Sequence, residues 1–101
     1  MPKREQLEEL LKSDPDDIFL QYGLAMAYVS EGNTAKGLEQ LVNVIENNPD
    51  YVAAYFQRGQ LLADQGETDA ARDIVARGIE VARRVGDAHA ESEMTGFLEM
   101  L

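Results

Sequence analysis

The sequence repeats its helix-ending and helix-starting residues at a fixed interval of 34 positions. The recurring pairs are Pro15 and Pro49, Gly32 and Gly66, Thr34 and Thr68, and Ile45 and Ile79. A period of this length is typical of arrays of two-helix hairpins, in which each hairpin buries its apolar side against its neighbours. The sequence therefore predicts an all-α fold built from antiparallel helix-turn-helix repeats.

The spacing of apolar and helix-breaking residues predicts about six helices. They are expected over residues 3–13, 17–31, 35–47, 51–65, 69–85 and 88–100. Gly32 and Gly66 stand where a helix can end in the left-handed conformation, which costs glycine little. Thr34 and Thr68 are expected to cap the helices that follow them, and Asp87 is expected to cap the last helix. Every connection is short, as between antiparallel neighbours.

The repeated landmarks resemble the tetratricopeptide repeat, whose pattern is Trp-x-x-Leu-Gly-x-x-Tyr, then Ala-x-x-x-Phe, then Pro. The first copy holds Gln21, Leu24, Ala25, Tyr28, Gly37, Leu41 and Pro49, and the second holds Tyr55, Arg58, Gly59, Leu62, Ala71, Val75 and Arg83. The departures from the pattern are Gln21 in the Trp position, Arg58 in the Leu position and Arg83 in the Pro position.

The resemblance covers nearly the whole chain, and it implies a single tetratricopeptide-repeat-like domain over residues 1–101. This domain would contain an N-terminal half repeat, two full repeats and a C-terminal capping helix, wound as a right-handed superhelix. The family resemblance also implies recognition of a protein or peptide, usually without catalysis.

The helix expected over residues 17–31 is apolar on two nearly opposite sides, at about 100° of rotation per residue. One stripe consists of Leu20, Leu24, Ala27 and Tyr28, and the other consists of Phe19, Tyr22, Met26 and Val29. Such a helix must be covered on both sides or present one side to a partner. In the family that the sequence resembles, the second stripe lines a concave groove. Coverage by a neighbouring helix of the same chain remains the alternative.

The candidate partner-binding groove combines the second stripe with its counterpart one repeat later. Its residues are Phe19, Tyr22, Met26, Val29, Phe56, Gln60 and Asp64. Some relatives clamp the C-terminal carboxylate of a chaperone with Lys, Arg and Asn on this face, and those residue types are missing here. Because aromatic residues anchor and methionine adapts, we expect an apolar peptide or an amphipathic helix of another protein.

The charge balance narrows the class of partner. With 19 acidic and nine basic residues the net charge is −10, which argues against nucleic acid and anionic membrane surfaces. Between Ser13 and Gln57 the only basic residue is Lys36, so the groove is expected to have an acidic rim. The acidic side chains are interpreted either as a solvated surface or as a means of steering a basic partner.

No motif in the sequence indicates catalysis, a metal or a cofactor. The chain has no cysteine, no glycine-rich phosphate loop and a single histidine, His89. The start of the chain shows no apolar signal segment, and no run of about 18 apolar residues occurs, so a cytoplasmic location is expected. We therefore expect a binding protein and not an enzyme.

A self-associating scaffold is the alternative function. Repeat arrays this short bury little core, since about three repeats are usually needed for stability. A homodimer formed through the exposed stripe, or through the end that contains Phe97, Leu98 and Met100, would supply the missing burial.

Overall fold

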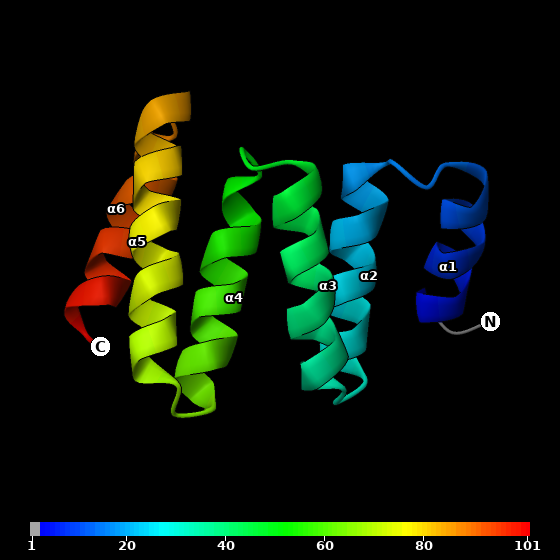
Figure 1. Ribbon diagram of the computed structural model, residues 1–101, viewed down its shortest axis with the longest axis horizontal. Helices are drawn as coiled ribbons and strands as arrows, with labels where there is room; N and C mark the ends of the chain where they lie inside the picture. Colours follow the sequence, from blue (N-terminus) through cyan, green and yellow to red (C-terminus); the bar gives the residue numbers. More distant parts are fainter. Residues whose placement is uncertain (1–2) are drawn as a thin grey trace. The chain divides into compact units, whose positions relative to one another are not determined.

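The computed structural model describes residues 3–101 as six α-helices, with no strand in that range (Figure 1). The helices are α1 (Lys3–Ser13), α2 (Ile18–Ser30), α3 (Thr34–Asn47), α4 (Val52–Asp64), α5 (Thr68–Val85) and α6 (Ala88–Glu99). Each lies within one residue of its expected bounds, which confirms the all-α repeat fold. The chain divides into two compact units, Met1–Asn48 and Pro49–Leu101.

In the first unit, α2 and α3 form an antiparallel hairpin with buried Leu24, Leu41 and Val44 between them. The two backbones approach closely at Gly37. A Cβ atom there would lie 3.2 Å from the backbone oxygen of Ala25 and 2.5 Å from Cγ2 of Val29. This close approach explains why a glycine occupies the fourth position of α3, despite its helix cost of about 1 kcal/mol relative to alanine.

Helix α1 packs along the side of α2 that carries Gly23, where a Cβ atom would lie 3.5 Å from Cδ2 of Leu7. No residue of α1, all of which are described, is fully buried. Polar contacts add to this packing, since Arg4 Nε donates to Glu31 Oε1 at 2.8 Å and the Arg4 guanidinium lies 5.5 Å from the centre of the Tyr28 ring. Helix α1 therefore covers the side of α2 that carries Gly23.

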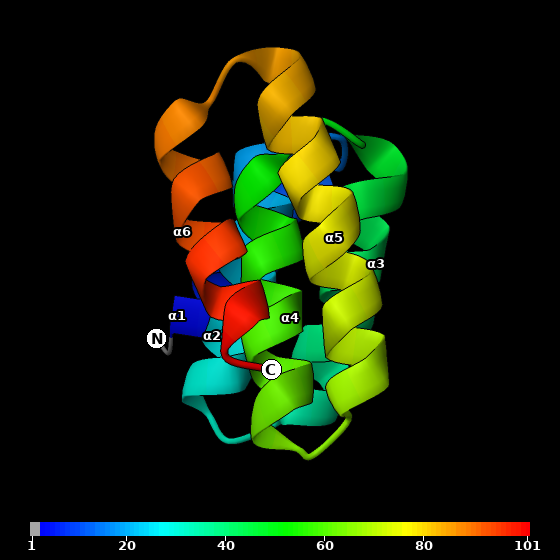
Figure 2. The same ribbon diagram turned by 90° about the vertical axis from the view of Figure 1, so that its left-hand side faces the viewer.

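In the second unit, α6 packs against α5 and, to a smaller extent, α4 (Figure 2). Gly78 lies where the three helices meet. A Cβ atom at Gly78 would lie 2.7 Å from Cβ of Tyr55 on α4 and 2.7 Å from Sδ of Met94 on α6. Tyr55 and Met94 are both buried. Helix α6 thus closes the open side of the α4–α5 hairpin, as expected of a capping helix.

The predicted glycine turns are confirmed. Gly32 and Gly66 follow α2 and α4 with φ of 82° and 79°, a conformation that other L-residues adopt only at a cost. The cap predicted at Asp87 is also confirmed, because its carboxylate accepts the backbone N–H three residues later at 3.1 Å. Asp17 caps α2 in the same way at 3.0 Å.

The two threonine caps were predicted wrongly. Thr34 is the first residue of α3, and the capping residue is Asn33, whose side-chain oxygen accepts the N–H of Lys36 at 3.3 Å. Thr68 is likewise the first residue of α5, and the preceding Glu67 makes no capping bond with its side chain. Helices α3 and α5 begin one residue earlier than expected, because the residue directly after each turn glycine already takes the capping position.

Over residues 3–101, no helix combines the length and apolar character needed to cross a membrane. The same part of the chain contains no group of three or more histidine, aspartate or glutamate side chains arranged to hold a metal ion.

Candidate functional site

The side of α2 between its contacts with α1 and α3 carries three large apolar residues. Helix α1 meets α2 at Gly23, and α3 meets it at Ala25. Phe19, Tyr22 and Met26 project into the arc between these contacts, at about 100° of rotation per residue. We call these three residues the α2 face.

Exposure differs along the α2 face. Phe19 is 73% exposed, and Tyr22 and Met26 are half-buried. Phe19 lies in the first turn of α2, two residues after the capping Asp17, so its backbone is held in the helix while its ring remains in solvent. A folded helix therefore presents an exposed aromatic ring at its N-terminal end.

Val29, which the sequence placed in the same stripe, lies at the edge of the α2 face. Its Cγ2 atom stands 2.5 Å from the position that a Cβ atom at Gly37 would occupy. The missing side chain of Gly37 makes room for this methyl group, so Val29 fills the α2–α3 interface and is only half-exposed.

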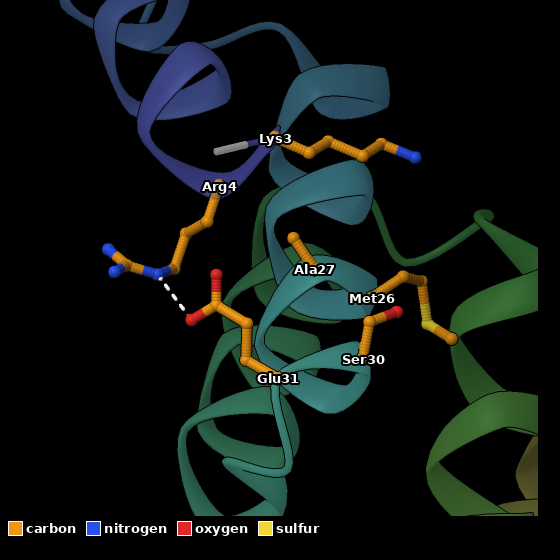
Figure 3. A pocket seen from close by; sticks show the side chains of 6 residues that line it. All are labelled: Lys3, Arg4, Met26, Ala27, Ser30 and Glu31. Atoms are coloured by element: carbon orange, nitrogen blue, oxygen red, sulfur yellow. Dashed lines mark hydrogen bonds and ion pairs between the residues drawn. The ribbon is translucent and has the colours of Figure 1, made fainter. Parts of the chain in front are cut away.

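A pocket of about 220 Å³ lies beside Met26, at the C-terminal half of α2 (Figure 3). The pocket is lined by Lys3, Arg4, Met26, Ala27, Ser30 and Glu31. The hydrogen bond with Glu31 holds the Arg4 side chain in place and raises its pKa above the ordinary value. Lys3 extends away from Arg4 in Figure 3 and forms no ion pair with residues 3–101.

The two ends of the α2 face differ in charge. Asp14 and Asp16 precede Phe19, are exposed, and form no ion pair within the described residues. At the other end the charged residues that line the pocket are Lys3, Arg4 and Glu31, and Arg4 is paired with Glu31. Lys3 is therefore the charged side chain at this end that has no ion pair within residues 3–101, and the sequence did not lead us to expect a basic residue here. The sequence signal that could have indicated it is the adjacent basic pair Lys3-Arg4 in an otherwise acidic chain.

The other three predicted residues belong to α4, in the second unit, and share one side of that helix at i, i+4 and i+8. Phe56 is half-buried, and its ring packs edge-on against Phe97 of α6, with centroids 5.6 Å apart and planes at 67°. Gln60 is half-buried and Asp64 is exposed at the end of α4. The predicted site residues therefore form two sets, one on α2 and one on α4.

Comparison with known proteins identifies the family. The family description "Tetratricopeptide repeat" matches residues 22–90. A TPR repeat-containing protein of Pseudomonas aeruginosa is 33% identical over 97 residues, which cover 96% of this chain and 92% of that protein. The bovine DnaJ homolog subfamily C member 3 is 37% identical over 68 residues, which cover 67% of this chain and 14% of that longer protein.

A solved structure supports the same assignment. The solution structure of a tetratricopeptide repeat domain protein from Salinibacter ruber matches this fold with a TM-score of 0.81 and 35% sequence identity, covering 85% of this chain and 87% of that one. Repeats of this kind generally mediate protein–protein interaction and are typically without catalytic activity. The chain is a member of the tetratricopeptide-repeat family.

Proposed function

We propose that this chain is a protein-interaction module whose α2 face holds an apolar segment of a partner protein. The observation that carries the proposal is the exposed ring of Phe19 on a well-capped helix. Phe19, Tyr22 and Met26 follow i, i+3 and i+7, so they lie along one line of the helix surface. A single exposed apolar residue is ordinary, whereas a row of large ones beside a pocket is typical of an interaction site.

The occupant that fits this surface is an amphipathic helix of another protein. A helix presents apolar side chains at i, i+3 or i+4, and i+7, which matches the spacing of the α2 face. The charges give the occupant a direction, with a basic residue toward Asp14 and Asp16 and an acidic residue toward Lys3. Opposite charges placed at the edge of an apolar contact chiefly set its orientation and its association rate.

On α4 we propose a separate and more polar contact. Gln60 and Asp64 supply hydrogen-bonding groups on one side of the helix. Phe56 contributes less than Phe19 because Phe97 already covers part of its ring. The α2 face is therefore the main anchor for a partner and the α4 residues are accessory contacts.

The proposal is tested with helical peptides selected from a display library against the wild-type chain. We expect Phe19→Ser and Met26→Ser, and likewise Tyr22→Ala, to weaken peptide binding about tenfold or more, the loss typical of an anchor residue. The matched control is Met100→Ser, because Met100 is 77% exposed but lies after α6. Circular dichroism checks that the helical content of each variant is unchanged.

Peptides that bind the Phe19 and Met26 variants as tightly as the wild type, and lose affinity with Met100→Ser, would contradict the proposal. Selection that yields no binding peptide at any concentration tested would count against the α2 face as well.

Self-association is the second candidate function, and the exposure of Leu10 and Met100 favours it. These residues are 54% and 77% exposed, and they provide apolar surface outside the α2 face. Sedimentation equilibrium decides between the candidates. A dimer that Leu10→Ser or Met100→Ser dissociates would support a homodimeric scaffold, and a monomer at every accessible concentration would exclude it.

A further inference from the structure

A pocket of about 210 Å³ lies between α4 and α5, entirely within the second unit. Its lining consists of Arg58, Leu62, Ala70, Asp73, Ile74 and Arg77. Two guanidinium groups thus line one hollow in a protein whose net charge is −10. None of these residues belongs to the α2 face or to the accessory contacts on α4.

The guanidinium group of Arg77 packs against the aromatic ring of Tyr55. Its guanidinium carbon lies 5.6 Å from the centre of the Tyr55 ring, a distance suited to a cation–π contact. Tyr55 is itself fixed, because it is buried and its hydroxyl donates a hydrogen bond to the Pro49 carbonyl at 2.7 Å. Arg77 is therefore oriented without the help of a carboxylate.

Arg77 also differs from most other arginines of the chain in its ion pairs. Ion pairs with carboxylates are formed by Arg4, Arg72, Arg83 and Arg84. Arg77 forms none with any residue in the described range 3–101. Arg77 is exposed, so its guanidinium can be reached from solvent.

Arg58 stands in the position where the repeat pattern has a leucine, and it is half-buried. Burial lowers the pKa of Arg58, and the positive charge of Arg77 lowers it further. Both effects disfavour the charged form of Arg58, which a nearby anion would favour. A bound anion would therefore interact favourably with the positive charges of both arginines.

We propose that Arg58 and Arg77 form a binding site for an oxyanion, namely the carboxylate or phosphate group of a protein or peptide. A planar guanidinium donates paired N–H bonds to two oxygens of such a group. Leu62 and Ile74 provide apolar walls, which limit competition from water. This site does not depend on the α2 face and can be tested independently of it.

Asp73 also lines the pocket, and its carboxylate opposes an incoming anion. The two arginines outweigh this single negative charge, so the lining remains net positive. Asp73→Asn should remove the opposition and tighten anion binding roughly threefold, which corresponds to an exposed charge interaction below 1 kcal/mol. This variant tests the site through a gain of affinity, which a damaged fold would not produce.

The experiment is an NMR titration of the full chain with sodium phosphate, and separately with sodium acetate, at constant ionic strength. We expect saturable shifts of the backbone amides of Arg58, Ile74 and Arg77. Arg58→Leu and Arg77→Gln should each weaken phosphate binding about tenfold, since each removes charge-assisted hydrogen bonds. Arg58→Leu restores the residue common to the repeat, so the fold should be retained. Arg84→Gln is the matched control and should bind as the wild type does.

Comparing phosphate with acetate distinguishes a phosphorylated ligand from a carboxylate ligand. Tighter binding of phosphate supports a phosphorylated group, and comparable binding of acetate supports a carboxylate. Small shifts that spread over the whole chain without saturating would overturn the proposal, because they report only screening. An Arg77→Gln variant that unfolds more easily but binds phosphate unchanged would also overturn it, since Arg77 would then serve only to cover Tyr55.

Discussion

The hairpins α2–α3 and α4–α5 solve the same packing problem with different residues. Gln21 and Tyr55 occupy equivalent positions of the repeat, and each donates a hydrogen bond to the carbonyl of a proline six residues earlier, at 2.7 Å in both cases. The partner carbonyls belong to Pro15 and Pro49. Gln21 therefore preserves the hydrogen bond of this position without the aromatic ring, which shows that the donor is the part retained in both hairpins.

The close helix crossing is likewise preserved by an exchange of residues. In the first hairpin Ala25 on α2 faces Gly37 on α3, whereas in the second Gly59 on α4 faces Ala71 on α5. The glycine thus lies on the second helix of the first hairpin and on the first helix of the second hairpin. A small residue on either side is enough, because the requirement is a short distance between backbones and not a particular helix.

The outward sides of the two hairpins differ much more. Where α2 carries Phe19 and Met26, the equivalent positions of α4 hold Ala53 and Gln60. Tyr22 by contrast corresponds to another aromatic residue, Phe56. Two of the three residues of the α2 face therefore lack a large apolar counterpart on α4, which supports placing the proposed anchor for a partner on α2.

The largest effects are expected in the cores. Leu41 and Val75 are equivalent positions, and both are fully buried. Leu41→Ala should lower the free energy of unfolding by about 3 kcal/mol, and Val75→Ala should lower it by about 2 kcal/mol, because each leaves a cavity and loses apolar burial. Urea unfolding followed by circular dichroism measures both. A loss below about 1 kcal/mol at either position would show that the neighbouring helices collapse into the space.

The shared hydrogen bond to proline gives the next effect. Gln21 also accepts a bond from Asn47 at 2.9 Å, so Gln21→Ala removes two interactions and should cost about 2 kcal/mol. Tyr55→Phe removes only the hydroxyl and should cost about 1 kcal/mol. Unfolding midpoints of the two variants, compared with Asn43→Ala as a surface control, test the equivalence. Equal stability of Gln21→Ala and wild type would refute it.

The turn glycines should behave alike. Gly32→Ala and Gly66→Ala each force an L-residue to φ near 80°, and each should lower the free energy of unfolding by about 1 kcal/mol. Gly96→Ala is the control, because Gly96 lies inside α6 with open space around its Cα, so alanine should be neutral or stabilising there. Thermal unfolding of the three variants measures the difference. A turn variant as stable as Gly96→Ala would contradict the account.

The helix caps should differ, and their effects are the smallest. Asn33→Ala removes the cap of α3 and should cost about 1 kcal/mol, whereas Glu67→Asn supplies a missing cap to α5 and should stabilise by about 0.5 kcal/mol. Thr34→Ala is the control and should change little, since Thr34 is not the cap. If Thr34→Ala lowered the free energy of unfolding more than Asn33→Ala, Thr34 and not Asn33 would be the capping residue.

Local signals made the fold predictable from the sequence, and tertiary contacts explain what was missed. Helix bounds follow from glycines, prolines and apolar spacing, which act within a few residues. The Asn33 cap was missed because two adjacent residues both suit that position. The role of Val29 depends on the absence of a side chain at Gly37, across the hairpin. The proposed oxyanion site of Arg58 and Arg77 depends on the contact between Arg77 and the Tyr55 ring, which residue spacing alone does not reveal.

The most direct test of the α2 face is a titration of the chain, labelled with ¹³C at its methionine methyl groups, with a selected helical peptide. The chain has four methionines, and Met26, Met94 and Met100 lie on the α2 face, in the core and at the exposed end respectively. We predict a saturable shift of the Met26 methyl signal while the Met94 and Met100 signals stay in place. A shift confined to Met100, with the Met26 signal unchanged at saturation, would contradict the proposal.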